Sequence, residues 1–254
     1  MVSRFLEAGK NQLTCECEIM NKYKNVHLWM ILVFVAVFLG FARGYWSDLA
    51  NESFGHHLHM FSALLWFGLV MSQPYLATRG SLKTHRRNGM IGLFVAGMVV
   101  ASAALMMPAN IEGAAGREEG GFVGAVFLYG VTFFDLVSVL AFSVCFIMAA
   151  LRSKQMDDHA MWMIASVYAI LAPAFGRLMI FPLGMIMGFE NLTFIKVLII
   201  STPFVLAFIL ITAWRFKQLH PALIFAFVVN LAGFVVGPVG RSDAWRAICD
   251  AVFL

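Results

Sequence analysis

The chain has 254 residues, of which 61% are hydrophobic and 13% are charged, whereas a soluble domain has about half apolar and about one quarter charged residues. A mean hydropathy of +0.83 excludes an ordinary soluble globular domain and predicts a membrane protein. The formal net charge of +4 fits lysines and arginines that meet anionic lipid at a membrane surface. We therefore expect the lipid bilayer as a partner and no nucleic acid, and the sequence names no protein partner.

Residues 1–27 carry no long apolar run and are predicted to form a cytoplasmic N-terminal tail. Met20 opens a short basic flank, so residues 1–19 are expected to be a misassigned upstream start. Cys15 and Cys17 form a Cys-x-Cys pair, which supplies two thiolates where a structural zinc site uses four ligands. We therefore interpret this segment as a tail and not as a metal site.

Seven stretches are long and apolar enough for one helix each, because a bilayer core about 30 Å thick requires about 20 residues. They are residues 28–46, 58–78, 90–109, 122–151, 160–189, 192–214 and 221–240. Backbone groups in lipid must be paired within their own segment, which predicts an all-α polytopic membrane helix bundle over residues 28–240. Residues 241–254 are predicted to be an outer C-terminal tail. The runs 122–151 and 160–189 exceed one crossing, so their helices must tilt, kink or protrude.

Lysines and arginines gather at alternate turns between these stretches. With seven crossings, the basic turns after Arg79, Arg152 and Arg215 fall on the same side as the N-terminal flank. The positive-inside rule assigns that side to the cytoplasm. The N-terminus is then cytoplasmic, the C-terminus lies outside, and the plasma membrane is the expected location.

The three basic turns share one pattern, an arginine followed by a polar stretch, a histidine and a helix. Their sequences are "RGSLKTHRRNGMIG", "RSKQMDDHAMWMIA" and "RFKQLHPALIFA". The pattern indicates one leading helix followed by three similar hairpins, because internal repeats are common in membrane bundles. Three loops that each need a basic residue at the start and a helix cap at the end would also look similar. The sequence therefore does not decide whether the three hairpins are a true repeat.

The turns place His85, His159 and His220 at the same end of three helices. Three neutral imidazoles with Asp157 or Asp158 would suit zinc or another divalent transition metal. Two imidazoles from facing helices could instead ligate haem b. The sequence therefore predicts a metal or haem site on the cytoplasmic side.

Helix capping is the alternative explanation for these histidines. Thr84, Asp158 and His220 itself stand where the three helices are expected to start, and such residues often cap helices. A second group in "GHHLHMF" includes His59 at the outer start of another helix. Both interpretations of the histidines stay open.

Six segments carry a resemblance to known proteins: "HHLHMFSALLWFGLVMSQPYLATRG", "LKTHRRNGMIG", "FFDLV", "DDHAMWMIA", "FGRL" and "QLHPALIFA". Over about residues 45–240 the chain resembles a family of uncharacterised bacterial multi-pass membrane proteins. The resemblance implies a helix bundle in the bacterial inner membrane and no particular activity. The positions that match the family's polar pattern are His59, His85, Asp135, His159, Arg177 and His220. The chain departs from the pattern at "HAMWM", where a basic residue usually follows the histidine. The histidine layout is also similar to that of cytochrome-b561-like proteins, which motivates the haem hypothesis.

Asp135 and Arg177 are charged residues well inside apolar runs, where one charge costs about 2.5–3.5 kcal/mol at the bilayer centre. They lie almost equally far from the turn near residues 155–156, so we predict that they share one level and form an intramembrane ion pair. Pro173 and Gly176 predict a bend in the helix that carries Arg177. A charge pair beside such a break is typical of a transport path, and equally of a buried structural pair.

Three functions follow as hypotheses. The first is a metal- or haem-binding membrane protein, and the second is a small-solute or proton transporter that uses Asp135 and Arg177. The third is an assembly or partner subunit with no site of its own. The chain contains no phosphate-binding loop, nucleophile elbow or His-Glu-x-x-His motif, so hydrolase and kinase activities have no support. Whether the protein is an enzyme stays open, and no catalytic residue is assigned.

Overall fold

The computed structural model describes residues 22–254, which contain only helices joined by turns. The predicted all-α fold is confirmed for this part of the chain. The predictions for residues 1–19, including Cys15 and Cys17, lie outside the described residues. The α-helices are α2 (Val26–Gly40), α3 (Phe54–Arg79), α4 (Leu82–Ala114), α5 (Ala125–Leu151), α6 (Met156–Ala169), α7 (Ala172–Met187), α8 (Phe194–Phe216), α9 (Pro221–Asn230), α10 (Val236–Gly240) and α11 (Asp243–Phe253). Short 3₁₀ turns cover Tyr45–Ser47, Leu49–Asn51, Phe189–Asn191 and Leu231–Phe234.

Four helices, α3, α4, α5 and α8, are long and apolar enough to cross a membrane. A fifth crossing results if α6 and α7 are counted as one bent span. Two further apolar helices are shorter, namely α2 and the segment Pro221–Phe234. The 15 residues of α2 extend only about 22 Å at about 1.5 Å per residue. The described residues therefore form a membrane helix bundle with four or five full-length spans.

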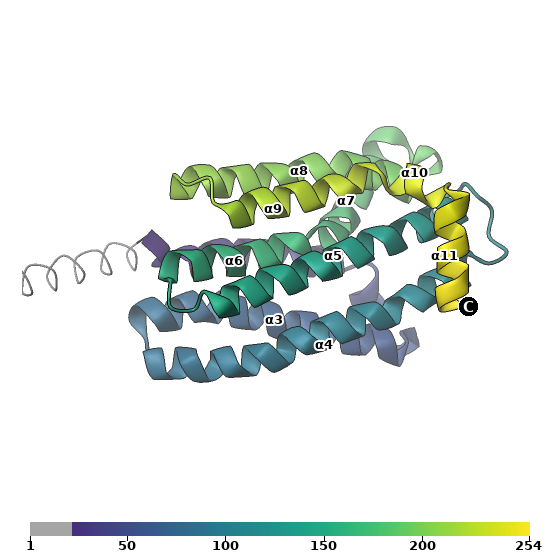
Figure 1. Ribbon diagram of the computed structural model, residues 1–254. Helices are drawn as coiled ribbons and strands as arrows, with labels where there is room; N and C mark the ends of the chain where they lie inside the picture. Colours follow the sequence, from purple (N-terminus) through teal and green to yellow (C-terminus); the bar gives the residue numbers. More distant parts are fainter. Residues whose placement is uncertain (1–21) are drawn as a thin grey trace, which may run out of the picture.

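The helices run side by side, and their turns gather at two ends of the bundle (Figure 1). One end holds Lys22–Asn25 and the turns between α3 and α4, between α5 and α6, and between α8 and α9. We call it the basic end because Arg79, Lys83, Arg152, Lys154 and Lys217 lie there. The loops of residues 41–53, 115–124 and 188–193 lie at the opposite end. In each of the three basic turns the two flanking helices pack against each other as a hairpin.

The predicted helix of residues 160–189 is broken at Ile170 and Leu171, and its halves α6 and α7 are bent by 46°. Pro173 lies in the first turn of α7. An N–H in the first turn has no acceptor within the helix, so a proline there removes no helical hydrogen bond. After the break the chain changes neighbours, because α6 packs against α5 and α9, whereas α7 packs against α2 and α8. The predicted bend is confirmed.

Buried polar groups from three other helices meet the break at Tyr168, the residue before the end of α6. The Tyr168 hydroxyl accepts a hydrogen bond from Trp29 Nε1 at 2.9 Å and pairs with the Thr212 hydroxyl. Asn230 Nδ2 donates to the backbone carbonyl oxygen of Tyr168 at 3.1 Å. Tyr168 thus joins α2, α8 and α9 to the broken helix.

A close glycine contact joins α5 to α10. A Cβ on Gly130 would overlap the carbonyl oxygen of Val236, and a Cβ on Gly240 would overlap the carbonyl oxygen of Val126. Small residues let backbones approach in membrane bundles, where van der Waals packing drives helix association. The short α10 therefore packs closely against α5 because glycines at the contact let the two backbones approach.

Residues 241–254, predicted as an outer C-terminal tail, are mostly helical. Helix α11 lies across the bundle at the opposite end, against α4 and α5 (Figure 1). Trp245 Nε1 donates to the carbonyl of Tyr129 at 2.8 Å, and Tyr129 donates to Asp250 at 2.7 Å. Arg246 binds both carboxylate oxygens of Glu119 at 2.7 and 2.6 Å. Ser242 caps the helix.

Helix starts at the basic end differ from those expected from the apolar runs. The cap of α4 is Ser81, whose hydroxyl accepts from the N–H of Thr84 at 3.3 Å, so Thr84 is not the cap. The N-cap residue of α6 is Gln155, and Asp158 lies in the first turn. Both helices include a polar first turn that hydropathy does not detect. His220 is the cap of α9, as predicted, and its Nδ1 accepts from the N–H of Ala222 at 3.1 Å.

Candidate functional sites

His85 and His159 are neighbours at the basic end. Their rings stand edge to face with centroids 6.3 Å apart, and they come from α4 and α6. The Nδ1 atom of His159 lies 2.8 Å from the carbonyl oxygen of Ala149, which fixes this nitrogen as the donor and orients the ring. The Nδ1 atom of His85 is buried and has no partner.

His220 does not join that pair, because its two ring nitrogens have partners of their own. Nδ1 caps α9, and Nε2 lies 3.0 Å from the carboxylate of Asp158. The other oxygen of Asp158 accepts from Arg152. His220 is 4% exposed, so a metal ion could reach it only by displacing these contacts.

Asp157 makes a second junction beside Asp158. It accepts from Lys22 at 2.7 Å and from the hydroxyl of Tyr23 at 2.6 Å. Lys22 also donates to the side chain of Gln218 at 2.7 Å. Burial and the hydrogen bond to Asp157 raise the pKa of Tyr23 above its ordinary value. The two adjacent aspartates therefore connect the start of α2 with the α5–α6 and α8–α9 turns.

The metal hypothesis can be compared with this geometry. Among residues 22–254, no group of three or more His, Cys, Asp or Glu residues is arranged to hold a metal ion. A structural zinc site needs four protein ligands, whereas His85 and His159 at the basic end are only two neighbouring imidazoles. The predicted ligand His59 lies toward the opposite end of the bundle, on α3.

A second polar cluster surrounds His59 in the half of the bundle away from the basic end. His59 Nδ1 lies 3.2 Å from the hydroxyl of Ser102 on α4, and Ser102 lies 2.9 Å from the hydroxyl of Ser62. Both serines are fully buried. A histidine of α3 is thus held against α4 by hydroxyl groups in an apolar environment.

Asp135 and Arg177 belong to the same region. Asp135 on α5 accepts from Asn110 Nδ2 on α4 at 3.3 Å. Arg177 on α7 donates to the carbonyl of Pro173 at 3.1 Å, and its guanidinium lies 4.9 Å from the ring centroid of Phe41. We call the side chains of His59, Ser62, Ser102, Asn110, Asp135 and Arg177 the polar cluster.

The predicted direct ion pair between Asp135 and Arg177 is not formed, since no ion pair in the described part of the chain joins them. The charge of Arg177 is nevertheless close enough to act on Asp135, on His59 and on Glu52. The side chain of Arg177 is itself exposed on α7.

Sequence reasoning missed three members of the polar cluster, Ser62, Ser102 and Asn110. Serines are common in membrane helices, where they also bond to the carbonyl one turn earlier, as Ser62 does to His59 and Ser102 to Val99. Asn110 lies one residue beyond the predicted run 90–109. A polar side chain close to an apolar run was the available signal for Asn110, but its partner could not be identified without the helix rotations.

Comparisons of the chain with protein-family models, with curated proteins and with solved structures find no match. The fold and the two clusters therefore carry the functional argument, and the class they define is a polytopic helical membrane protein with polar side chains inside the bundle.

Proposed function

We propose that the protein is a membrane transporter for a small solute or for protons, and that the polar cluster is its site. Ionisable residues within membrane helices are costly and usually mark a substrate or proton path. Here Asp135 of α5 and His59 of α3 both contact polar side chains of α4, Asn110 at 3.3 Å and Ser102 at 3.2 Å, and the charge of Arg177 on α7 acts on each of them. This gathering on three helices is the observation that carries the proposal.

The break between α6 and α7 supports the same function. In many transporters the substrate site lies beside discontinuous helices near the middle of the membrane. Arg177 lies on α7, six residues after the break at Leu171. Its guanidinium has donors to spare, because Pro173 is its one hydrogen-bond acceptor among the described residues. An anionic group of a solute would fit these donors, while Asp135 and His59 can each accept a proton.

The finer topology belongs to the proposal as well. We propose seven crossings, in which α2 and the segment 221–240 complete the set, with the basic end in the cytoplasm of a bacterial cell. The lysines and arginines of the basic end support this orientation.

The transport proposal is tested with purified protein in liposomes that contain the pH dye pyranine. A potassium gradient with valinomycin sets the membrane potential, and the initial rate of internal pH change is recorded. We expect the wild type to exceed empty liposomes at least tenfold, and Arg177→Gln to lose most of this rate while Arg177→Lys keeps more of it. A wild-type rate equal to that of empty liposomes, together with no uptake of small labelled carboxylates, would exclude the proposal.

Metal or haem binding is the second candidate, and the pairing of His85 with His159 is the observation that favours it. His159 is oriented by the Ala149 carbonyl, as metal-bound histidines usually are, and Nδ1 of His85 has no partner. Metal analysis and an absorption spectrum of the purified protein test this candidate. Less than one metal ion per ten chains and no Soret band would remove it.

A further inference from the structure

The helix break also creates a groove between α2 and α8 near the basic end. Beyond the break α7 packs between α2 and α8, whereas α6 turns toward α5 and α9. A groove of about 370 Å³ therefore remains between α2 and α8 at the basic end. This volume is in the range of about 300–1,000 Å³ typical of ligand sites.

The groove is apolar along its length. It is lined by Val26, Leu28, Trp29, Leu32, Ile211 and Phe216, with Thr212 in its wall. The polar atoms in the wall have partners, because Trp29 Nε1 and the Thr212 hydroxyl both bind the hydroxyl of Tyr168. An occupant therefore needs no polar groups at this depth, and a hydrocarbon chain fits.

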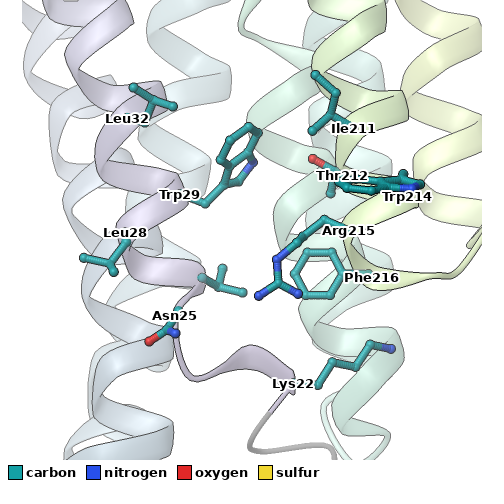
Figure 2. A pocket seen from close by; sticks show the side chains of 11 residues that line it. Lys22, Asn25, Leu28, Trp29, Leu32, Ile211, Thr212, Trp214, Arg215 and Phe216 are labelled. Atoms are coloured by element: carbon teal, nitrogen blue, oxygen red, sulfur yellow. The ribbon is translucent and has the colours of Figure 1, made fainter.

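The mouth of the groove carries positive charge. Figure 2 shows Trp29 and Arg215 pointing into the space between the two helices, with Lys22 below them. Lys22 is held by Asp157 and Gln218. Arg215, by contrast, makes no hydrogen bond or ion pair with any residue of the described range 22–254, and its side chain is exposed. Its donors are free for an anionic group at the membrane surface.

The outer rim of the groove faces away from the protein. Leu28 is 57% exposed and Trp214 is 79% exposed. Tryptophan and arginine at the end of a membrane helix are typical of the lipid headgroup level. The groove thus opens sideways where lipid chains lie, with the cations at the headgroup level.

From this arrangement we infer that the groove binds one anionic phospholipid of the membrane leaflet at the basic end. Its phosphate contacts Arg215, with Lys22 adding positive charge, and one acyl chain lies between α2 and α8 as far as Leu32 and Ile211. Guanidinium groups bind phosphate through paired hydrogen bonds. The lipid fills the space that the helix break leaves between α2 and the rest of the bundle.

The experiment uses the full chain in phosphatidylcholine nanodiscs that contain 0 to 30% phosphatidylglycerol as the anionic probe. Native mass spectrometry after gentle release from the nanodisc measures the fraction of protein that keeps a bound lipid. We expect one phosphatidylglycerol to stay bound in preference to phosphatidylcholine. Arg215→Gln should reduce this preference about fivefold to tenfold. The matched control is Arg87→Gln, an exposed arginine of α4 at the same end, which should change it less than twofold.

Quenching of tryptophan fluorescence supplies a second readout that does not depend on release. Lipids with brominated acyl chains should quench the wild type at a lower mole fraction when their headgroup is phosphoglycerol than when it is phosphocholine. Arg215→Gln should remove this difference while leaving the melting temperature within a few degrees.

Three results would overturn the inference. The first is an absence of any preference for phosphatidylglycerol in the wild type. The second is an equal loss in Arg215→Gln and Arg87→Gln, which would show general attraction to a basic surface. The third is binding that appears only in a chain lacking residues 1–19, because the N-terminal segment of the chain would then be the occupant.

Discussion

The side chain of Asn230 donates a hydrogen bond to the backbone carbonyl of Tyr168 at 3.1 Å, where the helix of residues 156–187 is broken. A carbonyl released by a break inside a membrane must find another donor. Asn230 is 1% exposed and also donates to the carbonyl of Ala226. Asn230 of α9, about 60 positions further along the chain, therefore stabilises the break.

The first prediction concerns this contact. Asn230→Leu should lower the free energy of unfolding by about 1–3 kcal/mol, because the buried Tyr168 carbonyl would lose its side-chain donor and keep only the long 3.5 Å contact from the N–H of Leu171. Asn191→Ala, at an exposed asparagine of the opposite end, is the control and should change it by less than about 0.5 kcal/mol. The measurement is thermal unfolding in detergent. Equal melting temperatures for the two variants would show that the break does not depend on Asn230.

The second prediction tests the close contact of α5 with α10. Gly240→Ala should destabilise the protein by about 1–3 kcal/mol, because the added methyl group overlaps the Val126 carbonyl. Gly68→Ala in α3 is the matched control, since a Cβ there meets nothing within 4 Å. Alanine is favoured over glycine in a helix by about 1 kcal/mol, so this control should be neutral or stabilising. If both variants melt alike, α10 does not pack on α5 as described.

The third prediction tests the docking of α11 through Glu119 and Arg246. Cys249 is the buried residue of α11, and burial raises the pKa of its thiol to about 11. A chain that keeps only this cysteine should react slowly with thiol reagents at neutral pH. Glu119→Gln should increase the rate severalfold by loosening α11. Glu118→Gln, at the neighbouring exposed carboxylate, should leave the rate unchanged.

The pairing of Glu119 with Arg246 also predicts that the docking of α11 depends on pH. The hydrogen bond from Arg246 lowers the pKa of Glu119, so the pair stabilises the docked helix fully above the unfolded carboxyl pKa of about 4.3. This contribution is lost as the pH falls through the lower folded pKa. With a dithiodipyridine reagent that reacts in acid, the difference between wild type and Glu119→Gln should be full from about pH 5 to 8 and shrink as the pH falls below about 4. A difference that does not change with pH would contradict the role of the carboxylate.

The fourth prediction tests whether the exposed side chain of Arg177 meets water at the opposite end. In a chain without other cysteines, Arg177→Cys should react with a charged, water-soluble thiol reagent added from the opposite end. Reagent added from the basic end should not reach it. Phe134→Cys, at a position 1% exposed, is the control and should not react from either side. Failure of Arg177→Cys to react from the opposite end would show that this side chain does not meet water.

The features that the sequence predicts correctly are local ones. Hydropathy finds the four long helices α3, α4, α5 and α8. Pro173 marks the break, and His220 before Pro221 marks a helix start, because each of these signals depends on residues a few positions apart. The helix α11 could have been found in the same way, since Ser242 stands before an amphipathic segment, but its length is too short for a span. Polar first turns hid the true starts of α4 and α6.

The contacts of Asp135 could not be predicted because they depend on helix rotation and not on depth. Counting residues from the α5–α6 turn places Asp135 and Arg177 at a common level, but it does not say which way either side chain faces. The 46° bend then takes α7 away from α5 toward α2 and α8. Asp135 consequently meets Asn110 of α4, while Arg177 remains at a distance from it.

The measurement that tests the transport proposal most directly is the proton flux of Asp135→Asn in liposomes, compared with Asp243→Asn as a control. The substituted asparagine keeps the size of the aspartate side chain but cannot be ionised, whereas Asp243 lies on α11 outside the bundle. We predict that Asp135→Asn keeps less than about one tenth of the wild-type rate, a loss of at least about 1.4 kcal/mol of barrier lowering, and that Asp243→Asn keeps the full rate. Equal rates for wild type and a correctly folded Asp135→Asn would contradict the assignment of the polar cluster as the transport site.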